Sequence, residues 1–155
     1  MTVILPAEIR DAEILREVCI KAFEEDKSMY GLMPPDIDKI SWHKCNIDRG
    51  LYYKIVVNNE IVGGVKLFSI NTRHYRVGTI YITPEHQNNN IGTEVINFIE
   101  GEYPQVKKWS LDTPYKSFRN HHFYEKLGYI KIGEEHPNQG SEFCLYLYEK
   151  NITRE

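Results

Sequence analysis

Hydrophobic residues in the first third of the chain recur with the spacing of helices. From Ile9 to Phe23 they fall three or four positions apart, which places them on one side of a helix. The acidic stretch that follows ends in Pro34-Pro35, a pair typical of loops. The elements predicted for this part are a strand over Val3–Leu5, a helix from Glu8 to Phe23, a loop-rich segment over Glu24–Asp38, and a helix over Asp38–Arg49 closed by Gly50.

From Leu51 onward the pattern changes to the two-residue alternation of strands. Asn58-Asn59 is a turn signal between two such runs, which predicts a hairpin. Helical spacing returns twice, which predicts a mixed α/β fold. The predicted strands are Leu51–Val57, Glu60–Ile70, Tyr75–Ile82, Lys107–Leu111, Tyr129–Ile132 and Glu142–Tyr148, and the predicted helices carry Ile91 to Tyr103 on one face and span Ser117–Leu127, with Gly128 just after the second.

Length and composition are those of one globular domain over residues 1–155, with 41% apolar and 26% charged residues. The net charge of −3 gives no general reason to expect a nucleic-acid partner. The apolar runs are too short to span a bilayer, and the segment Met1–Asp11 lacks the basic start of a signal peptide. We therefore expect neither a nucleic-acid partner nor a membrane partner.

The cysteines are few, odd in number and far apart: Cys19, Cys45 and Cys144. No CxxC pair occurs, so we interpret them as reduced packing thiols of a cytoplasmic protein. A nucleophilic cysteine is the alternative, although no activating motif flanks any of the three. His43 with Cys45 is too sparse for a zinc site, and we expect no metal.

Three consecutive asparagines, Asn88–Asn90, lie between a predicted strand and the helix that begins at Ile91. Asparagine enters the left-handed backbone region more readily than most residues, and glycine does so freely. Such a loop can gather backbone N–H groups at the positive end of a helix, which suits a pyrophosphate. No Lys or Arg occurs from Ile80 to Gln105, so backbone amides would do most of this binding. The alternative is a polar surface turn that caps the helix.

A second motif, RNHHFYEKLGYIKIGE, spans residues 119–134. Together with YITPEHQNNNIG at residues 81–92, it resembles the GCN5-related N-acetyltransferase (GNAT) superfamily. The acetyl-CoA loop of that family reads Gln/Arg-x-x-Gly-x-Gly/Ala; Gln87 and Gly92 match it, and Asn90 stands where the middle glycine is usual. The FYEKLGY run matches the later family motif, and the resemblance covers nearly the whole chain. The GxxxxGK[ST] and GxGxxG motifs are absent, which disfavours a nucleotide hydrolase or a dinucleotide enzyme.

The resemblance implies an α/β (α+β) fold with a mixed, mostly antiparallel central sheet of about six or seven strands, helices on both faces, and a splay between the fourth and fifth strands. It implies acetyl-CoA as the cofactor, with CoA as the product. The pantetheine arm would pair with the backbone of Ile80 and Ile82, and the N–H of Ile82 would polarise the thioester carbonyl. The amides expected to bind the pyrophosphate are those of Gln87, Asn88, Asn89, Asn90, Ile91, Gly92 and Thr93.

The resemblance places Tyr124 as the acid that protonates the departing thiolate. A phenol with a pKa of ~10 can donate to a thiolate whose thiol has a pKa of ~8.5 at modest cost. Asn120, one helical turn earlier, would contact pantetheine, although the family asparagine falls nearer Ser117. Basic residues of this helix would meet the 3′-phosphate of CoA: Lys116, Arg119 and Lys126. The alternative is that Tyr124 only packs and that the basic residues form a solvated face.

The general base is left open, because the strand over Val77–Ile82 lacks the glutamate that many relatives carry. The candidates are Glu85, His86, Asp112, His121, His122 and a chain of water molecules. The implied activity is acetyl-CoA-dependent N-acetyl transfer to a primary amine of a small molecule or a protein. The alternative is a non-catalytic CoA- or acyl-CoA-binding regulatory module.

The first third of the chain would select the acceptor amine, since its acidic residues suit a cation. These residues are Glu24, Glu25, Asp26, Asp36 and Asp38, and the aromatic residues expected to line a pocket are Tyr30, Trp42, His43, Tyr52 and Tyr53. A homodimer is compatible with the fold, and no sequence feature decides it.

Overall fold

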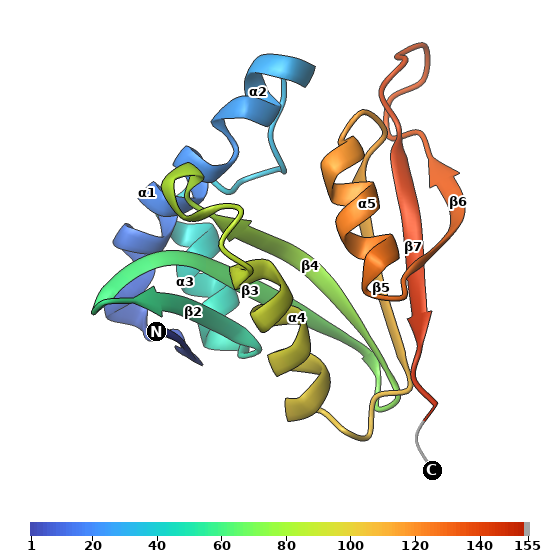
Figure 1. Ribbon diagram of the computed structural model, residues 1–155. Coiled ribbons are helices and arrows are strands. Elements are labelled where there is room, and N and C mark those ends of the chain that lie inside the picture. The colour runs from blue at the N-terminus through green and yellow to red at the C-terminus, as the bar shows by residue number, and fades with distance from the viewer. Residues whose placement is uncertain (154–155) are drawn as a thin grey trace. The chain divides into compact units, whose positions relative to one another are not determined.

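The computed structural model of the chain describes residues 1–153, which form a mixed α/β structure (Figure 1). Within these residues the sheet has seven strands in the order β1-β2-β3-β4-β5-β7-β6. The strands are β1 (Thr2–Pro6), β2 (Tyr52–Val57), β3 (Glu60–Asn71), β4 (His74–Ile82), β5 (Lys108–Pro114), β6 (Ile130–Glu135) and β7 (Leu145–Asn151). The helices are α1 (Ala12–Ala22), α2 (Glu24–Tyr30), α3 (Ile40–Arg49), α4 (Ile91–Glu102) and α5 (Phe118–Lys126), with 3₁₀ turns η1 (Ile9–Asp11) and η2 (Pro84–His86).

Antiparallel pairing dominates the sheet, which confirms the expected mixed, mostly antiparallel architecture. β2 pairs antiparallel with β1 and β3, and β7 pairs antiparallel with β5 and β6. The parallel pair is β4 with β5, which joins His74–Arg76 to Lys108–Ser110. The chain folds as two compact units: unit 1 is Met1–Leu67 with Thr79–Glu102, and unit 2 is Phe68–Gly78 with the segment from Tyr103 onward.

Unit 1 places helices on both faces of its strands. Neighbouring residues of a strand point to opposite faces, and Tyr52 and Tyr53 illustrate this. Tyr52 is buried in a core with Leu15 and Cys19 of α1, whereas the ring of Tyr53 packs edge-on against Phe98 of α4 at 5.5 Å. Figure 1 shows the same arrangement, with α1 and α3 on one face of β2 and α4 on the other.

A chain of hydrogen bonds crosses the core of unit 1. His43 Nε2 lies 2.8 Å from the Ile37 carbonyl oxygen, and His43 Nδ1 lies 2.8 Å from the Tyr52 hydroxyl. The Tyr52 hydroxyl lies 2.6 Å from that of Tyr81 on β4. A carbonyl only accepts, so Nε2 carries the proton; Nδ1 then accepts from Tyr52, which accepts from Tyr81. In this series of hydrogen bonds the N–H of His43 and the hydroxyls of Tyr52 and Tyr81 each donate to an acceptor, and the imidazole stays neutral.

Tyr81 also requires glycine at two positions of β3. A Cβ on Gly64 would lie 2.4 Å from the Tyr81 hydroxyl oxygen, and a Cβ on Gly63 would lie 2.2 Å from the Tyr81 carbonyl oxygen. Both distances are far inside van der Waals contact, so a side chain at Gly63 would displace the β4 backbone and one at Gly64 would displace the Tyr81 ring. The end of β4 is therefore fixed against β3 by close packing and by the hydroxyl bond to Tyr52.

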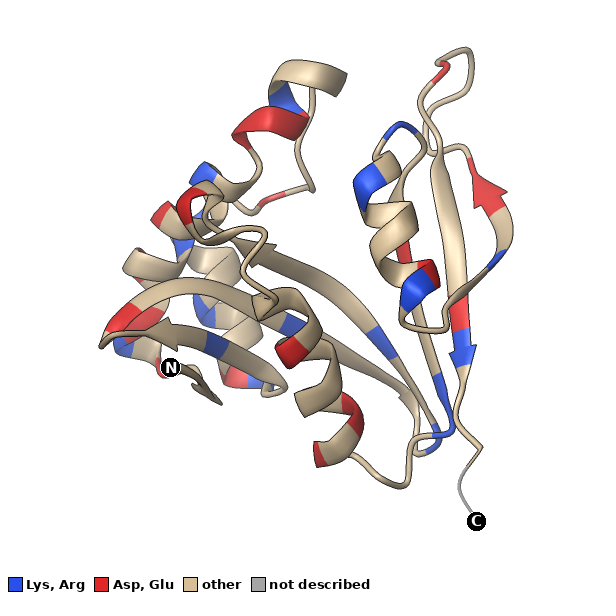
Figure 2. Ribbon diagram, in the orientation of Figure 1, with Lys and Arg blue, Asp and Glu red and all other residues tan. Residues whose placement is uncertain are grey.

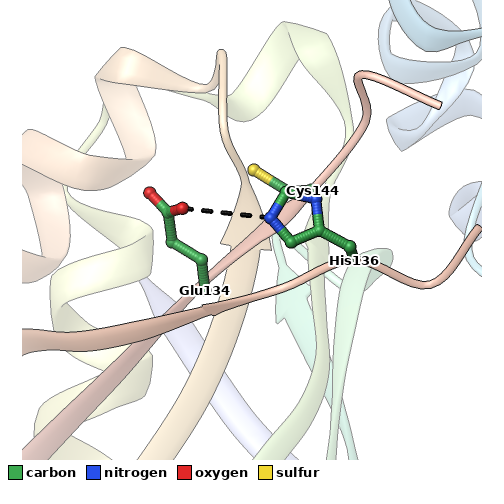
Figure 3. A group of neighbouring side chains, drawn as sticks. All are labelled: Glu134, His136 and Cys144. Carbon is green, nitrogen blue, oxygen red and sulfur yellow. Dashed lines mark ion pairs between the residues drawn. The ribbon is translucent and has the colours of Figure 1, made fainter. Parts of the chain in front are cut away.

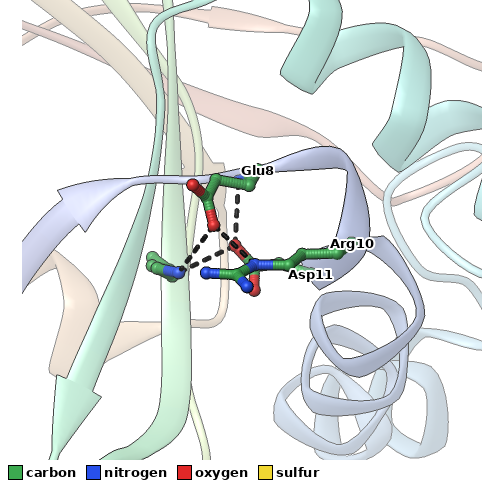
Figure 4. A network of polar contacts seen from close by, with 4 residues as sticks. Glu8, Arg10 and Asp11 are labelled. Atoms are coloured by element: carbon green, nitrogen blue, oxygen red, sulfur yellow. Dashed lines mark hydrogen bonds and ion pairs between the residues drawn. The ribbon is translucent and has the colours of Figure 1, made fainter.

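Charged side chains attach the start of α1 to β2 (Figure 4). Asp11 Oδ2 accepts from the Glu8 amide at 2.8 Å and from Lys54 Nζ at 2.9 Å. The Asp11 and Lys54 side chains expose only 10% and 13% of their surface, so solvent screens their attraction less than that of a surface pair. The contact of Arg10 with Glu8 at 2.7 Å is exposed and contributes little.

In unit 2, α5 packs on the face of β7 that carries Tyr146 and Tyr148. The ring of His121 stacks on Tyr146 at a centroid distance of 4.8 Å, and its Nε2 donates to the Pro114 carbonyl at 2.9 Å. The Tyr148 hydroxyl donates to the Glu125 carboxylate at 2.8 Å. Aromatic and polar contacts on successive turns therefore fix α5 to the strands.

The prediction of a loop-rich segment over Glu24–Asp38 is wrong for the first half of that segment, which forms α2. α2 buries none of its residues, so it lacks the apolar periodicity that predicts a helix. Three acids occupy its first turn, where they complement the helix dipole, and Gly31 ends it with φ of 73°. The other predicted elements are present with shifted ends: β7 begins at Leu145 rather than Glu142, and α1 begins at Ala12, after the 3₁₀ turn Ile9–Asp11, rather than at Glu8. No helix within residues 1–153 has the length and apolar character needed to cross a membrane.

Burial lowers the pKa of His43, because the neutral imidazole is favoured inside the core. In the unfolded chain this histidine has a pKa of ~6.5. Its contribution to stability is therefore present above pH ~6.5 and is lost as the pH falls through the lower folded-state pKa. We expect the free energy of unfolding, measured with urea, to fall from about pH 7 to about pH 5 more steeply in the wild type than in His43→Gln. The exposed His122→Gln is the matched control and should keep the wild-type slope; equal slopes in all three proteins would contradict the assignment.

Candidate active site

The loop between β4 and α4 follows its path because two asparagines are left-handed. Asn88 has φ of 69° and Asn90 has φ of 60°, a conformation that asparagine tolerates better than most side chains. The Asn90 carbonyl accepts from the Glu94 amide at 3.0 Å and so begins the hydrogen bonding of α4. The side chains of Asn88, Asn89 and Asn90 are exposed. The left-handed backbone that the sequence predicts for this loop is therefore present at Asn88 and Asn90.

The amides of residues 88–93 donate to no backbone acceptor within residues 1–153. Those of Ile91, Gly92 and Thr93 lack partners within the helix because they lie in its first turn. They also carry the positive end of the α4 dipole. Figure 2 shows neither Lys nor Arg on this loop or on α4. An anion bound here would therefore be held by peptide groups rather than by cationic side chains.

Gln87 anchors the loop to the end of β4. Its Nε2 donates to the Ile82 carbonyl at 3.0 Å, and its amide donates to the Pro84 carbonyl at 3.3 Å. The Thr83 amide donates to the Val62 carbonyl of β3 at 2.8 Å, which fixes the first residue of the turn. Because the Gln87 amide already has a partner, the amides that can meet an anion begin at Asn88.

Ile80 and Ile82 lie on the face of β4 opposite Tyr81, and both are half-buried. Within residues 1–153 the pairing of β4 with β5 ends at Arg76, before the strand reaches Ile80. The buried Tyr81 holds this stretch of backbone in place from the other face. The strand end is thus rigid at the two residues expected to meet pantetheine.

Tyr124 lies on α5 in an aromatic environment and is only 6% exposed. The rings of Tyr129 and Tyr148 lie at centroid distances of 5.8 and 6.4 Å. Burial raises the pKa of Tyr124, and the negative charge of Asp112 raises it further. The phenol therefore keeps its proton at neutral pH, as a proton donor must.

Asp112 of β5 forms an ion pair with Arg76 of β4. Arg76 lies opposite Ser110 in the parallel register, and Asp112, two residues beyond Ser110, shares its face of the strand. The Asp112 carboxylate, whose negative charge acts on Tyr124, is thus paired with the Arg76 guanidinium. Sequence analysis missed Arg76, because only the register between β4 and β5 brings the two residues together.

Asn120 and Lys126 share α5 with Tyr124 but have different surroundings. Asn120 Nδ2 donates to Thr113 Oγ1 of β5 at 3.3 Å, so its amide faces the strand. Lys126 is exposed in the last turn, where it complements the negative end of the helix dipole. The structure therefore brings Asn120 and Tyr124 to the strand side of α5 and leaves Lys126 at the surface.

Within residues 1–153 the candidate general bases have structural partners, except for the exposed His122. The hydrogen bond of Glu85 to its own backbone amide lowers the pKa of that carboxyl and weakens it as a base. The geometry therefore singles out none of these residues. The partners are Pro114 for His121, Thr83 for His86, Lys21 for Glu85 and Arg76 for Asp112.

Two aromatic residues expected to line an acceptor pocket belong instead to the core of unit 1. His43 and Tyr52 are 0% and 2% exposed, so that expectation is wrong for both. Trp42 packs edge-on against His43 at 4.8 Å. The acids Glu24 and Glu25 of α2 are exposed, and Figure 2 shows them as a red turn at the start of that helix.

Comparisons with known proteins agree with this arrangement. The family model described as acetyltransferase (GNAT) family matches residues 16–129. Over 110 residues the chain is 32% identical to an uncharacterized protein, YrkN, of Bacillus subtilis (strain 168); the match covers 68% of this chain and 58% of that protein.

Two solved structures share the fold. The PaiA N-acetyltransferase of Thermoplasma acidophilum, in complex with coenzyme A, has a TM-score of 0.80 at 18% identity and covers 98% of this chain and 99% of its own. The ribosomal-protein-S18-alanine N-acetyltransferase of Escherichia coli has a TM-score of 0.80 at 14% identity and covers 100% of this chain and 96% of its own.

Proposed function

Because the chain belongs to the acetyltransferase (GNAT) family, we propose that it is an acetyl-CoA-dependent N-acetyltransferase. The acceptor is a primary amine of a small molecule or a protein, and the amine attacks the thioester carbonyl directly. The observation that carries the proposal is the loop ahead of α4. Left-handed Asn88 and Asn90 shape it, and its amides from Asn88 to Thr93 have no backbone acceptor within residues 1–153.

These residues fit the cofactor by their chemistry. The amides of Asn88–Thr93 hold the diphosphate with the help of the α4 dipole. The backbone of Ile80 and Ile82 pairs with the pantetheine arm, and the N–H of Ile82 polarises the thioester carbonyl. Asn120 meets pantetheine, and Lys126 meets the 3′-phosphate. Acetyl-CoA supplies the activated acyl group as its thioester.

Tyr124 supplies the proton that the departing thiolate needs. Its buried phenol is neutral at physiological pH, and a thiolate whose thiol has a pKa of ~8.5 is basic enough to share its proton. The ion pair of Asp112 with Arg76 supports this role, because the nearby carboxylate is already paired with a cation and does not need the proton of the phenol. Tyr124 is therefore proposed as the catalytic residue.

The acceptor amine must lose its proton before attack, since an alkylammonium has a pKa of ~10.4. Within residues 1–153 the side chains weighed as bases are held by other contacts, apart from the exposed His122, so His122 or water takes this proton. The exposed acids of α2 favour a cationic acceptor over an anionic one.

A non-catalytic CoA-binding module is the second candidate, and the absence of an acid from the β4 residues Val77–Ile82 favours it. The two are separated by incubating the protein with acetyl-CoA and a panel of amines. We expect free CoA to be released in proportion to an acetylated amine detected by mass spectrometry. Binding of CoA without product from any amine would establish the regulatory alternative.

Tyr124→Phe removes the proton donor and keeps the ring. We expect turnover to fall roughly tenfold or more, with CoA affinity nearly unchanged, because the hydroxyl acts only as the thiolate leaves. The neighbouring buried Tyr129→Phe is the matched control and should keep wild-type turnover. A wild-type turnover number in Tyr124→Phe would exclude Tyr124 from the mechanism.

Asn90→Val places a β-branched side chain at a positive φ, where strain is on the order of 1–3 kcal/mol. We expect CoA affinity, measured by calorimetry, to fall about 10- to 100-fold in Asn90→Val and to stay within about threefold of wild type in Asn90→Gly. Asn89→Val is the control, since Asn89 is not among the residues with positive φ. An equal loss in Asn90→Gly and Asn90→Val would show that the asparagine side chain, not its backbone, binds the cofactor.

A further inference from the structure

The β6–β7 hairpin brings three side chains with metal-ligating atoms to one face. Its register pairs Glu134 with Tyr146 and Glu135 with Leu145. Continuing that register by one residue places His136 opposite Cys144. Glu134 lies two residues before His136, so it projects on the same side of the strand.

The ligand atoms of Glu134, His136 and Cys144 all lie within 4.8 Å of one another. His136 Nε2 is 4.0 Å from Glu134 Oε2. Figure 3 shows the Glu134 carboxylate and the Cys144 sulfur both close to the His136 ring. Side-chain rotation is enough to bring these atoms to the 2.0–2.3 Å ligand distances of a zinc ion.

The three residues differ in mobility in a way that suits a metal. Cys144 is buried, and its carbonyl accepts from the Tyr115 amide at 3.0 Å, which holds the backbone that carries its sulfur. His136 and Glu134 are exposed, with 58% and 43% of their side-chain surface accessible, so both can turn toward an ion.

We propose that Glu134, His136 and Cys144 form a binding site for a Zn²⁺ ion. A thiolate, an imidazole and a carboxylate match the ligand preference of zinc, whereas magnesium and calcium take oxygen ligands. Three protein ligands leave the fourth tetrahedral position to water. On binding, the Cys144 thiol releases its proton to the solvent. The ion joins the two ends of the loop 137–143, and this inference does not depend on the acyltransferase activity.

Lys131 sets the strength of this site. Its Nζ lies 2.9 Å from Glu134 Oε1 and 3.5 Å from the centroid of the Tyr146 ring. A cation beside the carboxylate opposes a second cation, so the ion must compete with Lys131 for Glu134. Removing that charge while keeping the length of the side chain, as in Lys131→Met, should strengthen the site.

The test is a calorimetric titration of chelator-treated full-length protein with Zn²⁺, repeated with Co²⁺ to observe the absorption of a cobalt–thiolate bond. We expect one ion per chain. His136→Ala and Cys144→Ser should each weaken Zn²⁺ binding at least about 100-fold, more than the loss of a residue that only supports a ligand. Cys45→Ser and His122→Ala change an exposed cysteine and an exposed histidine elsewhere and should bind as wild type.

Lys131→Met should bind Zn²⁺ roughly fivefold more tightly, the effect of removing one exposed charge. Circular dichroism identifies any variant that fails to fold, and the exposed His136→Ala keeps the test valid if the buried Cys144→Ser does not fold. The proposal is overturned if the wild type binds no Zn²⁺, if His136→Ala binds as wild type, or if Co²⁺ gives no thiolate absorption.

Discussion

The close packing of Tyr81 against β3 is the constraint on which the rest of unit 1 depends. Its ring and carbonyl leave room only for hydrogen at Gly63 and Gly64, and its hydroxyl is bonded to the buried Tyr52. β4 can therefore end in one place only. The side chain of Gln87 holds the following turn to the end of β4 through its hydrogen bond to the Ile82 carbonyl. The path of this turn determines where α4 begins. A loop built of exposed polar residues acquires a defined shape because its base is part of the core.

Charged and neutral groups have separate tasks in this molecule. The less exposed ion pairs, Lys54 with Asp11 and Arg76 with Asp112, join elements of the fold. Apart from Lys126, the groups proposed to meet the cofactor are uncharged, and they include the peptide amides ahead of α4 and the protonated phenol of Tyr124. In this proposal a cofactor with several negative charges meets mainly dipoles held in position, which need no reorganisation when the ligand arrives.

The sequence predicts most of the fold because apolar spacing and turn chemistry agree along the chain. The two asparagine pairs are the clearest case: Asn58 and Asn59 both have positive φ in the β2–β3 turn, and Asn88 and Asn90 do so before α4. The predictions that failed or were missed have two causes. α2 buries nothing and so leaves no periodic pattern, while contacts such as Arg76–Asp112 and Glu134–His136–Cys144 depend on strand register, which alternation alone does not specify.

An anion-binding loop that uses backbone amides also contains no ionisable group. From Gln87 to Thr93 the chain contains only amide, hydroxyl, aliphatic and glycine residues, none of which titrates in water at ordinary pH. When this loop takes up a diphosphate it neither gains nor loses a proton of its own. Acidification of the surroundings would act on it only through the protonation of the diphosphate itself.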